Sequence, residues 1–576
     1  MESVAEGIPS DAVIFGHWRS RPRQGLADRY LRHLRDALHG SGAFSELVRI
    51  LEERMKEDEK RDFALVARYW KKILEEIGWW RLFSREVAFA VRRGPAIAPG
   101  DGGRWEWIFL FHVGEKSRDE TLLAMRRVLF GLGAVFPQYG ILAKDRDGVP
   151  TTVLYDLDEE EQICAGGHGA VVALATSDQF LRESLKLLGG KGRGIAFVHS
   201  ERYFELREKR GAAAAAHSVE PGGQPAPSRL ELIYQPADTL RGNAALDVVE
   251  VFHLEARFQN DRIDWNLRYK LRESDDNLLA RALSSQGGVA DLLRRVPRSA
   301  VAFTAESGAQ PEVLYDYLLD LIGALSGGPF LPDALERQQS ELEFNVKDSV
   351  LRLLSGRRLS IVFSAEDGAA PEKSGDSRVY FLELKRQAGQ NARNEARTRL
   401  AELVRRIKEA GLAVETREVE GGGDEGKGDF FYVPTRAILG WPLLLGVTST
   451  DVVVATSEEA LGRALRAAAG DGESIAGNPA FADLWKLPEG RLSAVRYGSL
   501  AADLASLRGG LRLLGGLAKF VPGGGGAGVL KPLLRVLPRF QEAVRSLAFL
   551  ERRVSYSLRD GSSHSGRGTI FLKRRD

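Results

Sequence analysis

The sequence has 576 residues, more than a single hydrophobic core usually serves, so we expect at least two large domains. Hydrophobic residues at 44% and charged residues at 28% are ordinary globular values, and the net charge of +2 argues against a nucleic-acid partner. The chain has a single cysteine, Cys164, so no intramolecular disulfide is possible, and no apolar run is long enough to predict a transmembrane segment.

The first half opens with the apolar stretch Asp11–Trp18, which follows an Ile-Pro pair and predicts a strand. Gln24–Phe83 then has apolar residues at three- and four-residue spacing, which predicts a helical insertion. The apolar stretches Glu86–Val91 and Trp105–Val113 predict two further strands, and Asp119–Leu132 predicts a helix.

Further along the first half, Thr151–Tyr155 predicts a strand, and the low-complexity stretch Gly211–Ser228 predicts a mobile loop. Val249–Gln259 and Arg262–Leu271 predict a closing hairpin that turns at Asn260-Asp261.

One stretch of the first half, VVALATSDQFLRESLKLLGG at Val171–Gly190, returns as VVVATSEEALGRALRAAAG at Val452–Gly470. Each copy predicts a strand that ends at Ala-Thr-Ser and leads into a helix. The spacing of Thr176 with Gln179, and of Thr456 with Glu459, is typical of a capping box at the start of each helix. Leu465 lies on the apolar face of the second helix, so we expect its side chain to be buried.

The second half repeats the other predicted elements in the same order. VPRSAVAF corresponds to the opening strand and RLSIVF to Glu86–Val91, and the closing strands also return. In chain order, the matching segments of the second half are Val296–Phe303, Arg358–Phe363, Arg378–Leu384, Asn394–Ala410, Phe430–Val433, Arg553–Arg559 and Arg567–Lys573. Consecutive strands without intervening helices favour an α+β fold over a doubly wound parallel sheet. We therefore predict two homologous domains, 1–287 and 288–576, each a mainly antiparallel sheet backed by helices.

Motifs that carry chemistry are scarce. The sequence contains no GxSxG elbow and no HExxH, and the glycine-rich stretch Pro522–Gly528 lacks the lysine and hydroxyl of a phosphate loop. Cys164 and His168, in QICAGGHG, follow an acidic run, so a metal site and a simple turn both fit; the small number of ligands favours the turn. We accordingly expect no catalytic residues, no metal and no cofactor.

Tryptophan is concentrated in the first half, where six of the nine lie before residue 108. Trp105 and Trp107 are two residues apart on a predicted strand and so share one face of it. Trp18, His17, Trp105 and Trp107 are therefore the candidate lining of a ligand groove between the sheet and the helical insertion. The alternative is that these rings only pack the insertion against the sheet, since tryptophan is usually mostly buried.

The opening pattern of a hydrophobic residue, Pro, two variable residues and Ala-Val recurs at Ile8–Val13 and Val296–Val301. Together with the VVVATSEEAL block, the GNPAF at Gly477–Phe481 and the closing strands at Ala548–Leu572, it resembles a family of uncharacterised bacterial cell-envelope proteins, many of them predicted lipoproteins. GNPAF is missing from the first half. The resemblance implies a periplasmic or cell-surface location, whereas Met1–Pro9 shows no export signal.

A duplicated chain without a catalytic constellation predicts a non-enzymatic binding or structural protein of the bacterial cell envelope. Its partner would be a protein, a glycan or a lipid. Two alternatives stay open: a hydrolase that uses carboxylates of the first half, and a cytoplasmic protein-interaction scaffold. The location is periplasmic or cell-surface if an export signal is missing from this chain, and cytoplasmic otherwise.

Overall fold

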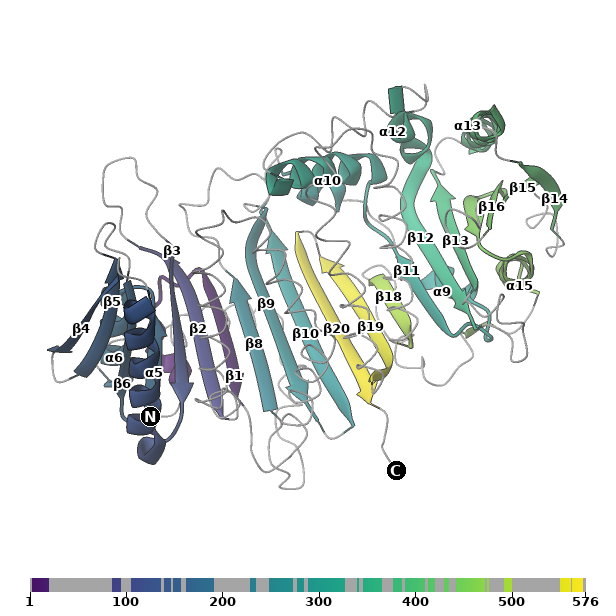
Figure 1. Cartoon of the computed structure of the whole chain (residues 1–576). Coiled ribbons are helices and arrows are strands. Elements are labelled where there is room, and N and C mark those ends of the chain that lie inside the picture. The colour runs from purple at the N-terminus through teal and green to yellow at the C-terminus, as the bar shows by residue number, and fades with distance from the viewer. Residues whose placement is uncertain are drawn as a thin grey trace. The chain divides into compact units, whose positions relative to one another are not determined.

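The computed structural model describes residues 3–19, 85–94, 105–135, 139–146, 149–156, 162–190, 228–234, 248–259, 261–272, 277–283, 288–326, 339–340, 345–364, 377–385, 389–409, 413–419, 429–434, 442–471, 474–475, 492–499, 550–560 and 562–572. The predicted helical insertion 24–83 and residues 211–227 of the predicted loop lie outside these ranges, whereas Ser228 begins a strand. Within them, helices and antiparallel strands are mixed, as the α+β prediction requires (Figure 1).

The chain divides into two compact units. The first comprises Met1–Gly242 and Val249–Leu267, and the second Asn243–Val248 and Arg268–Asp576.

The first unit contains an antiparallel sheet in the order β4-β5-β6-β7-β3-β2-β1-β8-β9. Its strands are β1 (Ile14–Arg19), β2 (Glu86–Arg93), β3 (Trp105–His112), β4 (Tyr139–Arg146), β5 (Val149–Asp156), β6 (Gln162–His168), β7 (Val171–Ala175), β8 (Ser228–Tyr234) and β9 (Val249–Phe258). β10 (Arg262–Leu271) follows β9 through a turn closed by the hydrogen bond from Gln259 N to Arg262 O, at 2.8 Å. The predicted closing hairpin is confirmed.

Two helices cover opposite faces of this sheet. Adjacent glycines of β6 show this, because Gly166 faces α6 (Asp178–Leu188) and Gly167 faces α5 (Glu115–Val135). β3 lies between the two layers, with Ile108 and Leu110 buried in the α6 core and Phe111 in the α5 core. A strand buried on both faces explains the nearly continuous apolar run WEWIFLFH.

The second unit contains an antiparallel sheet in the order β14-β15-β16-β17-β13-β12-β11-β18-β19-β20. Its strands are β11 (Ala302–Glu306), β12 (Leu354–Phe363), β13 (Ser377–Leu384), β14 (Glu415–Glu418), β15 (Asp429–Val433), β16 (Leu443–Val447), β17 (Asp451–Ala455), β18 (Leu492–Ser499), β19 (Leu550–Asp560) and β20 (Ser563–Leu572). The strand order of the first sheet, read from β4 across to β9, matches the order from β14 across to β19 in this sheet.

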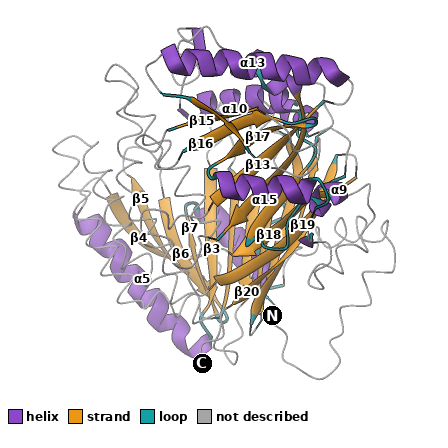
Figure 2. Cartoon of the chain, turned by 90° about the vertical axis from the view of Figure 1, so that its right-hand side faces the viewer, coloured by secondary structure: helices purple, strands orange, loops and turns teal. Residues whose placement is uncertain are grey.

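Figure 2 shows α13 (Gly389–Glu409) and α15 (Glu458–Ala468) on the two sides of β13, β16 and β17. α15 packs on the face of Phe381 and Val453, and α13 packs on the face of Leu382 and Val452. The smaller helices of this unit are α8 (Leu278–Ala282), α9 (Ala290–Arg294), α10 (Pro311–Ser326), α12 (Val346–Ser349) and the 3-10 turn η5 (Leu351–Leu353). The first unit has the 3-10 turn η1 (Val4–Gly7) where the second has α9.

The sheet register shows which residues correspond. β7 and β17 each lie between a β3-type and a β6-type strand, with Ala175 opposite Ile108 and Ala455 opposite Val379. Ile108 in turn faces Ala90, and Val379 faces Ile361. Segment 86–91 therefore matches 357–362, one residue before the match with RLSIVF drawn from the sequence. A one-residue shift exchanges the two faces of a strand. Each side chain of β12 therefore lies on the opposite face from the one expected from the sequence match.

The predicted capping boxes are wrong by one residue. Ser177 and Ser457 are the N-caps, and their hydroxyls accept from Phe180 N at 3.3 Å and Ala460 N at 3.4 Å. The threonine hydroxyls instead accept backbone N–H groups of the neighbouring strand, Thr176 from Trp107 and Thr456 from Arg378, each at 2.9 Å.

Candidate functional site

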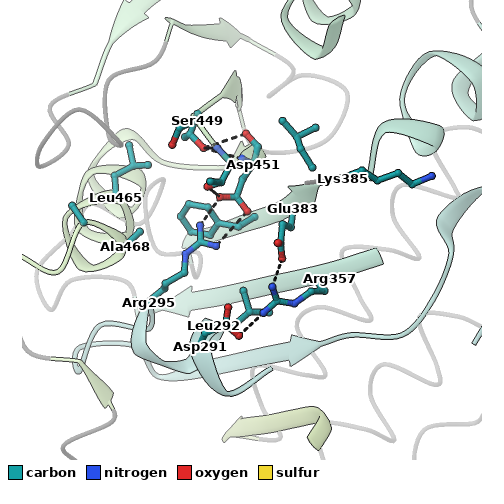
Figure 3. A pocket seen from close by; sticks show the side chains of 15 residues that line it. Asp291, Leu292, Arg295, Arg357, Glu383, Lys385, Ser449, Asp451, Leu465 and Ala468 are labelled. Atoms are coloured by element: carbon teal, nitrogen blue, oxygen red, sulfur yellow. Dashed lines mark hydrogen bonds and ion pairs between the residues drawn. The ribbon is translucent and has the colours of Figure 1, made fainter. Parts of the chain in front are cut away.

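A cavity of about 380 Å³ lies in the second unit (Figure 3). Its walls come from α9, β12, the end of β13, the β16–β17 turn and the C-terminal end of α15. The lining residues are Asp291, Leu292, Arg295, Arg357, Phe381, Glu383, Leu384, Lys385, Thr448, Ser449, Thr450, Asp451, Leu465, Ala468 and Ala469. Six of these fifteen side chains are charged, which is unusual for a cavity that borders the main core of its unit.

The first charged pair joins Arg295, which follows α9, to Asp451, the first residue of β17. Arg295 donates from Nη1 and Nη2 to the two carboxylate oxygens of Asp451, at 3.3 and 2.6 Å. Thr450 donates a further hydrogen bond to Asp451 at 2.6 Å, and the Asp451 side chain is only 1% exposed. The guanidinium carbon of Arg295 lies 4.8 Å from the ring centre of Phe381. This fork geometry fixes Arg295 at the cavity wall.

The second charged group is centred on Arg357 of β12. Its Nη1 lies 2.7 Å from Oε2 of the buried Glu383, and its Nη2 donates to Asp291 on α9. Burial alone would lower the pKa of Arg357, but the hydrogen bond to Asp291 and the nearby carboxylates outweigh it and raise that pKa. Lys385 extends away from both arginines and pairs at 2.8 Å with Glu312, which does not line the cavity.

In the first unit, leucine side chains close part of the corresponding place. By the register above, Leu188 of α6 corresponds to Ala468, Val171 to Asp451, and Gly7 to Arg295. A Cβ added to Gly7 would come within 2.7 Å of Leu188 and 2.9 Å of Leu110, so these residues are already in close contact. The cavity therefore arises where a leucine of one unit is an alanine in the other, and charged residues surround it.

His17, one of the predicted groove residues, belongs to a polar cluster of the first unit. Its Nε2 lies 2.7 Å from Oε1 of Glu86, and the Ser3 hydroxyl donates to the same oxygen. Burial would raise the pKa of Glu86, but the hydrogen bonds from His17 and Ser3 outweigh it and lower that pKa. The same Nε2 of His17 also lies 3.4 Å from the Ser3 hydroxyl, whereas a serine-hydrolase histidine faces its serine and its acid with different ring nitrogens.

A second histidine pair continues this cluster. His253 on β9 lies 2.8 Å from Glu231 on β8, and Glu231 is opposite His17 in the register. Burial would raise the pKa of Glu231, but the hydrogen bond from His253 and the charge of Arg229 lower it.

Trp18 and Trp107 lie on the other face of the sheet from His17. Trp18 is adjacent to His17 on β1, so it points to the opposite side of the sheet, where it packs edge-on to Phe258 at 5.1 Å. Trp107 packs edge-on to Phe109 at 5.5 Å on that same α5 side, and Trp105 lies two residues before it on β3. His17 therefore does not share a face of the sheet with Trp18 or Trp107. Ligand contact by the tryptophans stays a prediction, because the proposed opposite wall lies outside the described residues.

Cys164 and His168 lie on β6, so the interpretation of QICAGGHG as a turn is wrong. Glycine fits at positions 166 and 167 of this strand because helix side chains pack closely on both faces. Leu181 and Leu185 of α6 lie on one face, and Leu122 of α5 lies on the other. Cys164 is fully buried in the α6 core. Within the described ranges, no three His, Cys, Asp or Glu side chains are grouped so as to hold a metal ion.

Sequence reasoning missed the cavity of the second unit. Arg295 and Asp451 are 156 residues apart and belong to no recognised motif. The available signal was a difference between the two similar segments, because Asp451 stands where the segment of the first unit has the apolar Val171.

Comparison with known proteins finds neither a matching family nor a similar curated protein. Among solved structures, crystal form III of TP0453 is 9% identical, with a TM-score of 0.22 over 50% of this chain and 88% of that one. Crystal form I of TP0453 gives 9% identity and a TM-score of 0.21 over 50% and 87%. Similarity at this level carries no argument about this chain. In its described part, no helix has the length and apolar character needed to cross a membrane.

Proposed function

We propose that this chain is a non-enzymatic binding protein of the bacterial cell envelope whose small-molecule site is the cavity of the second unit. One observation carries the proposal: at corresponding places, one unit is closed by Leu188 against Gly7, and the other is open between Ala468 and Arg295. A void in a packed core costs stability, so an open cavity lined by fixed polar groups is the default position for a ligand.

The charged groups of the cavity support binding rather than catalysis. A general acid or base needs a proton-transfer group held near the reacting atoms with its pKa tuned to the working pH. Here Asp451 is held by Arg295, and both Glu383 and Asp291 are held by Arg357. These carboxylates serve to fix the two arginines.

The same comparison of units supports two homologous domains, proposed as residues 1–287 and 288–576. The shared strand order, Ala-Thr-Ser at the same point in both, and Phe15 of β1 placed like Phe303 of β11 all follow from a duplicated ancestor. After duplication one copy keeps the closed core and the other gains the cavity.

The envelope location rests on the sequence resemblance, and we propose a periplasmic or cell-surface position on that ground. Fractionation of cells that produce the protein from its own gene tests it. Recovery in the periplasmic or membrane fraction is expected. Recovery in the cytosol alone would overturn the location and leave the proposed binding site unaffected.

A fragment screen tests the binding function. Ligand-observed NMR with a diverse fragment set should find binders of the wild-type chain that Ala468→Leu loses, because leucine fills the cavity as Leu188 does in the first unit. Arg466→Leu, an exposed position two residues away on α15, is the matched control and should keep the binders. If the cavity-filling variant and the wild type bind the same fragments, the proposed site is wrong.

A further inference from the structure

The cavity of the second unit has no surplus charge. It is lined by three cations and three carboxylates: Arg295, Arg357 and Lys385 against Asp291, Glu383 and Asp451. Arg295 is matched by Asp451 at 2.6 Å, Arg357 by Glu383 at 2.7 Å and by Asp291, and Lys385 by Glu312 at 2.8 Å. Each of these side chains thus meets its opposite charge within the protein.

This compensation disfavours an ionic ligand. Burying a charged group is costly unless the site offers an opposite charge that is free to pair with it. A ligand anion beside Arg295 or Arg357 would also face Asp451 or Glu383, and a ligand cation beside a carboxylate would face its arginine. A neutral ligand avoids both penalties.

The cavity nevertheless has hydrogen-bonding capacity to offer. Arg357 Nε and Ser449 Oγ are buried lining atoms without a hydrogen-bond partner in the described structure. The guanidinium N–H only donates, whereas the serine hydroxyl both donates and accepts. A buried polar group left unpaired costs about 1–3 kcal/mol, which a ligand hydroxyl at the right place would recover.

The remaining walls are apolar, with Leu292, Leu384 and Leu465 among the lining side chains. Hydroxyl-bearing edges combined with C–H faces are the chemistry of a sugar or cyclic polyol. The volume of about 380 Å³ is in the lower part of the range for small-molecule sites, about 300–1,000 Å³. We propose that the cavity binds a neutral, hydroxyl-rich molecule of mono- to disaccharide size, an inference that rests on the proposed binding function.

The test compares sugars that share a ring and differ in charge. Isothermal titration of the full chain is carried out with glucose and N-acetylglucosamine (neutral), glucosamine in mildly acidic buffer (cationic) and glucuronate (anionic). A neutral sugar should bind saturably, at least tenfold more tightly than both charged ones. Ser449→Ala should weaken it by about two- to tenfold, the value of one neutral hydrogen bond. Ala468→Leu should abolish binding, and Arg466→Leu should leave it unchanged.

The outcomes separate the ligand class from the site. Tighter binding of glucosamine or glucuronate, lost in Ala468→Leu, overturns the neutral class and leaves the cavity as the site. Failure of every sugar while the fragment set still binds also overturns only the class. If neither sugars nor fragments bind, the proposed binding function is wrong as well. Sugar binding that persists in Ala468→Leu would place it elsewhere on the chain and overturn this proposal.

Discussion

Arg295 and Asp451 form a two-pronged ion pair between the end of α9 and the start of β17, with the closer contact at 2.6 Å. The corresponding residues of the first unit, Gly7 and Val171, carry no charge. The pair therefore marks a point where the two units differ in chemistry. It fixes one wall of the cavity and is the most direct place to perturb it.

Removing one partner of this pair should be costly. Asp451→Val, which introduces the residue of the first unit, leaves Arg295 largely buried without its carboxylate and should lower the free energy of unfolding by about 3–5 kcal/mol. Adding Arg295→Met should recover at least about 1 kcal/mol of that loss, because no buried charge is then left unpaired. Urea unfolding of both single variants and the double variant gives the coupling energy. Strictly additive losses would mean that the two side chains do not interact.

Leu465 tests the core beneath the cavity. The structure confirms that it is buried, at 2% exposure, in the cluster with Phe381 and Val453. Leu465→Ala should therefore destabilise the full chain by about 2–5 kcal/mol in denaturant unfolding. Leu318→Ala, at a leucine that is 45% exposed, serves as the control and should change stability by about 0.5 kcal/mol or less. Equal effects of the two variants would contradict the assigned burial.

The helix caps offer a test that separates the observed serine cap from the predicted threonine–glutamate capping box. Ser457→Ala removes the hydroxyl that accepts from Ala460 N and should cost about 1 kcal/mol of stability. Glu459→Ala should cost about 0.5 kcal/mol or less, because Glu459 is exposed and pairs with Arg463 one turn along the helix instead of closing a capping box. Thermal unfolding of both variants decides; a larger loss for Glu459→Ala would restore the capping-box interpretation.

His564 should make stability depend on pH. Its ring stacks on Tyr269 at 4.6 Å, and burial first, then the charge of Arg559, lower its pKa from 6.5 to about 4. Between these values the unfolded chain binds a proton that the folded chain does not, so stability falls as pH falls from 6.5 towards about 4. His564→Phe keeps a stacked ring without a titrating group.

Denaturant unfolding across this pH window measures the effect. The wild type should lose more stability on acidification than His564→Phe, by the equivalent of at most one proton. Parallel pH profiles for the two proteins would show that His564 titrates alike in the folded and unfolded chains.

The local elements of this protein could be predicted from its sequence. The period of the apolar residues in β3 and α15, and the return of Ala-Thr-Ser, depend only on neighbours along the chain, so the strand–helix units and the burial of Leu465 could be predicted. The α+β class followed from their order. These features are set by backbone geometry and side-chain spacing within one element.

Features that depend on two distant segments could not be predicted in this way. The register of β12, shifted by one residue from the sequence match, is set by its partners β11 and β13. His17 and Trp18 were predicted to share a groove, but a strand in a sheet packed on both faces directs neighbours to opposite sides. The cavity needed α9, β12, β13, β17 and α15 to meet, because its charges are neutralised by pairs as distant as Arg295 and Asp451, and no local pattern encodes such a meeting.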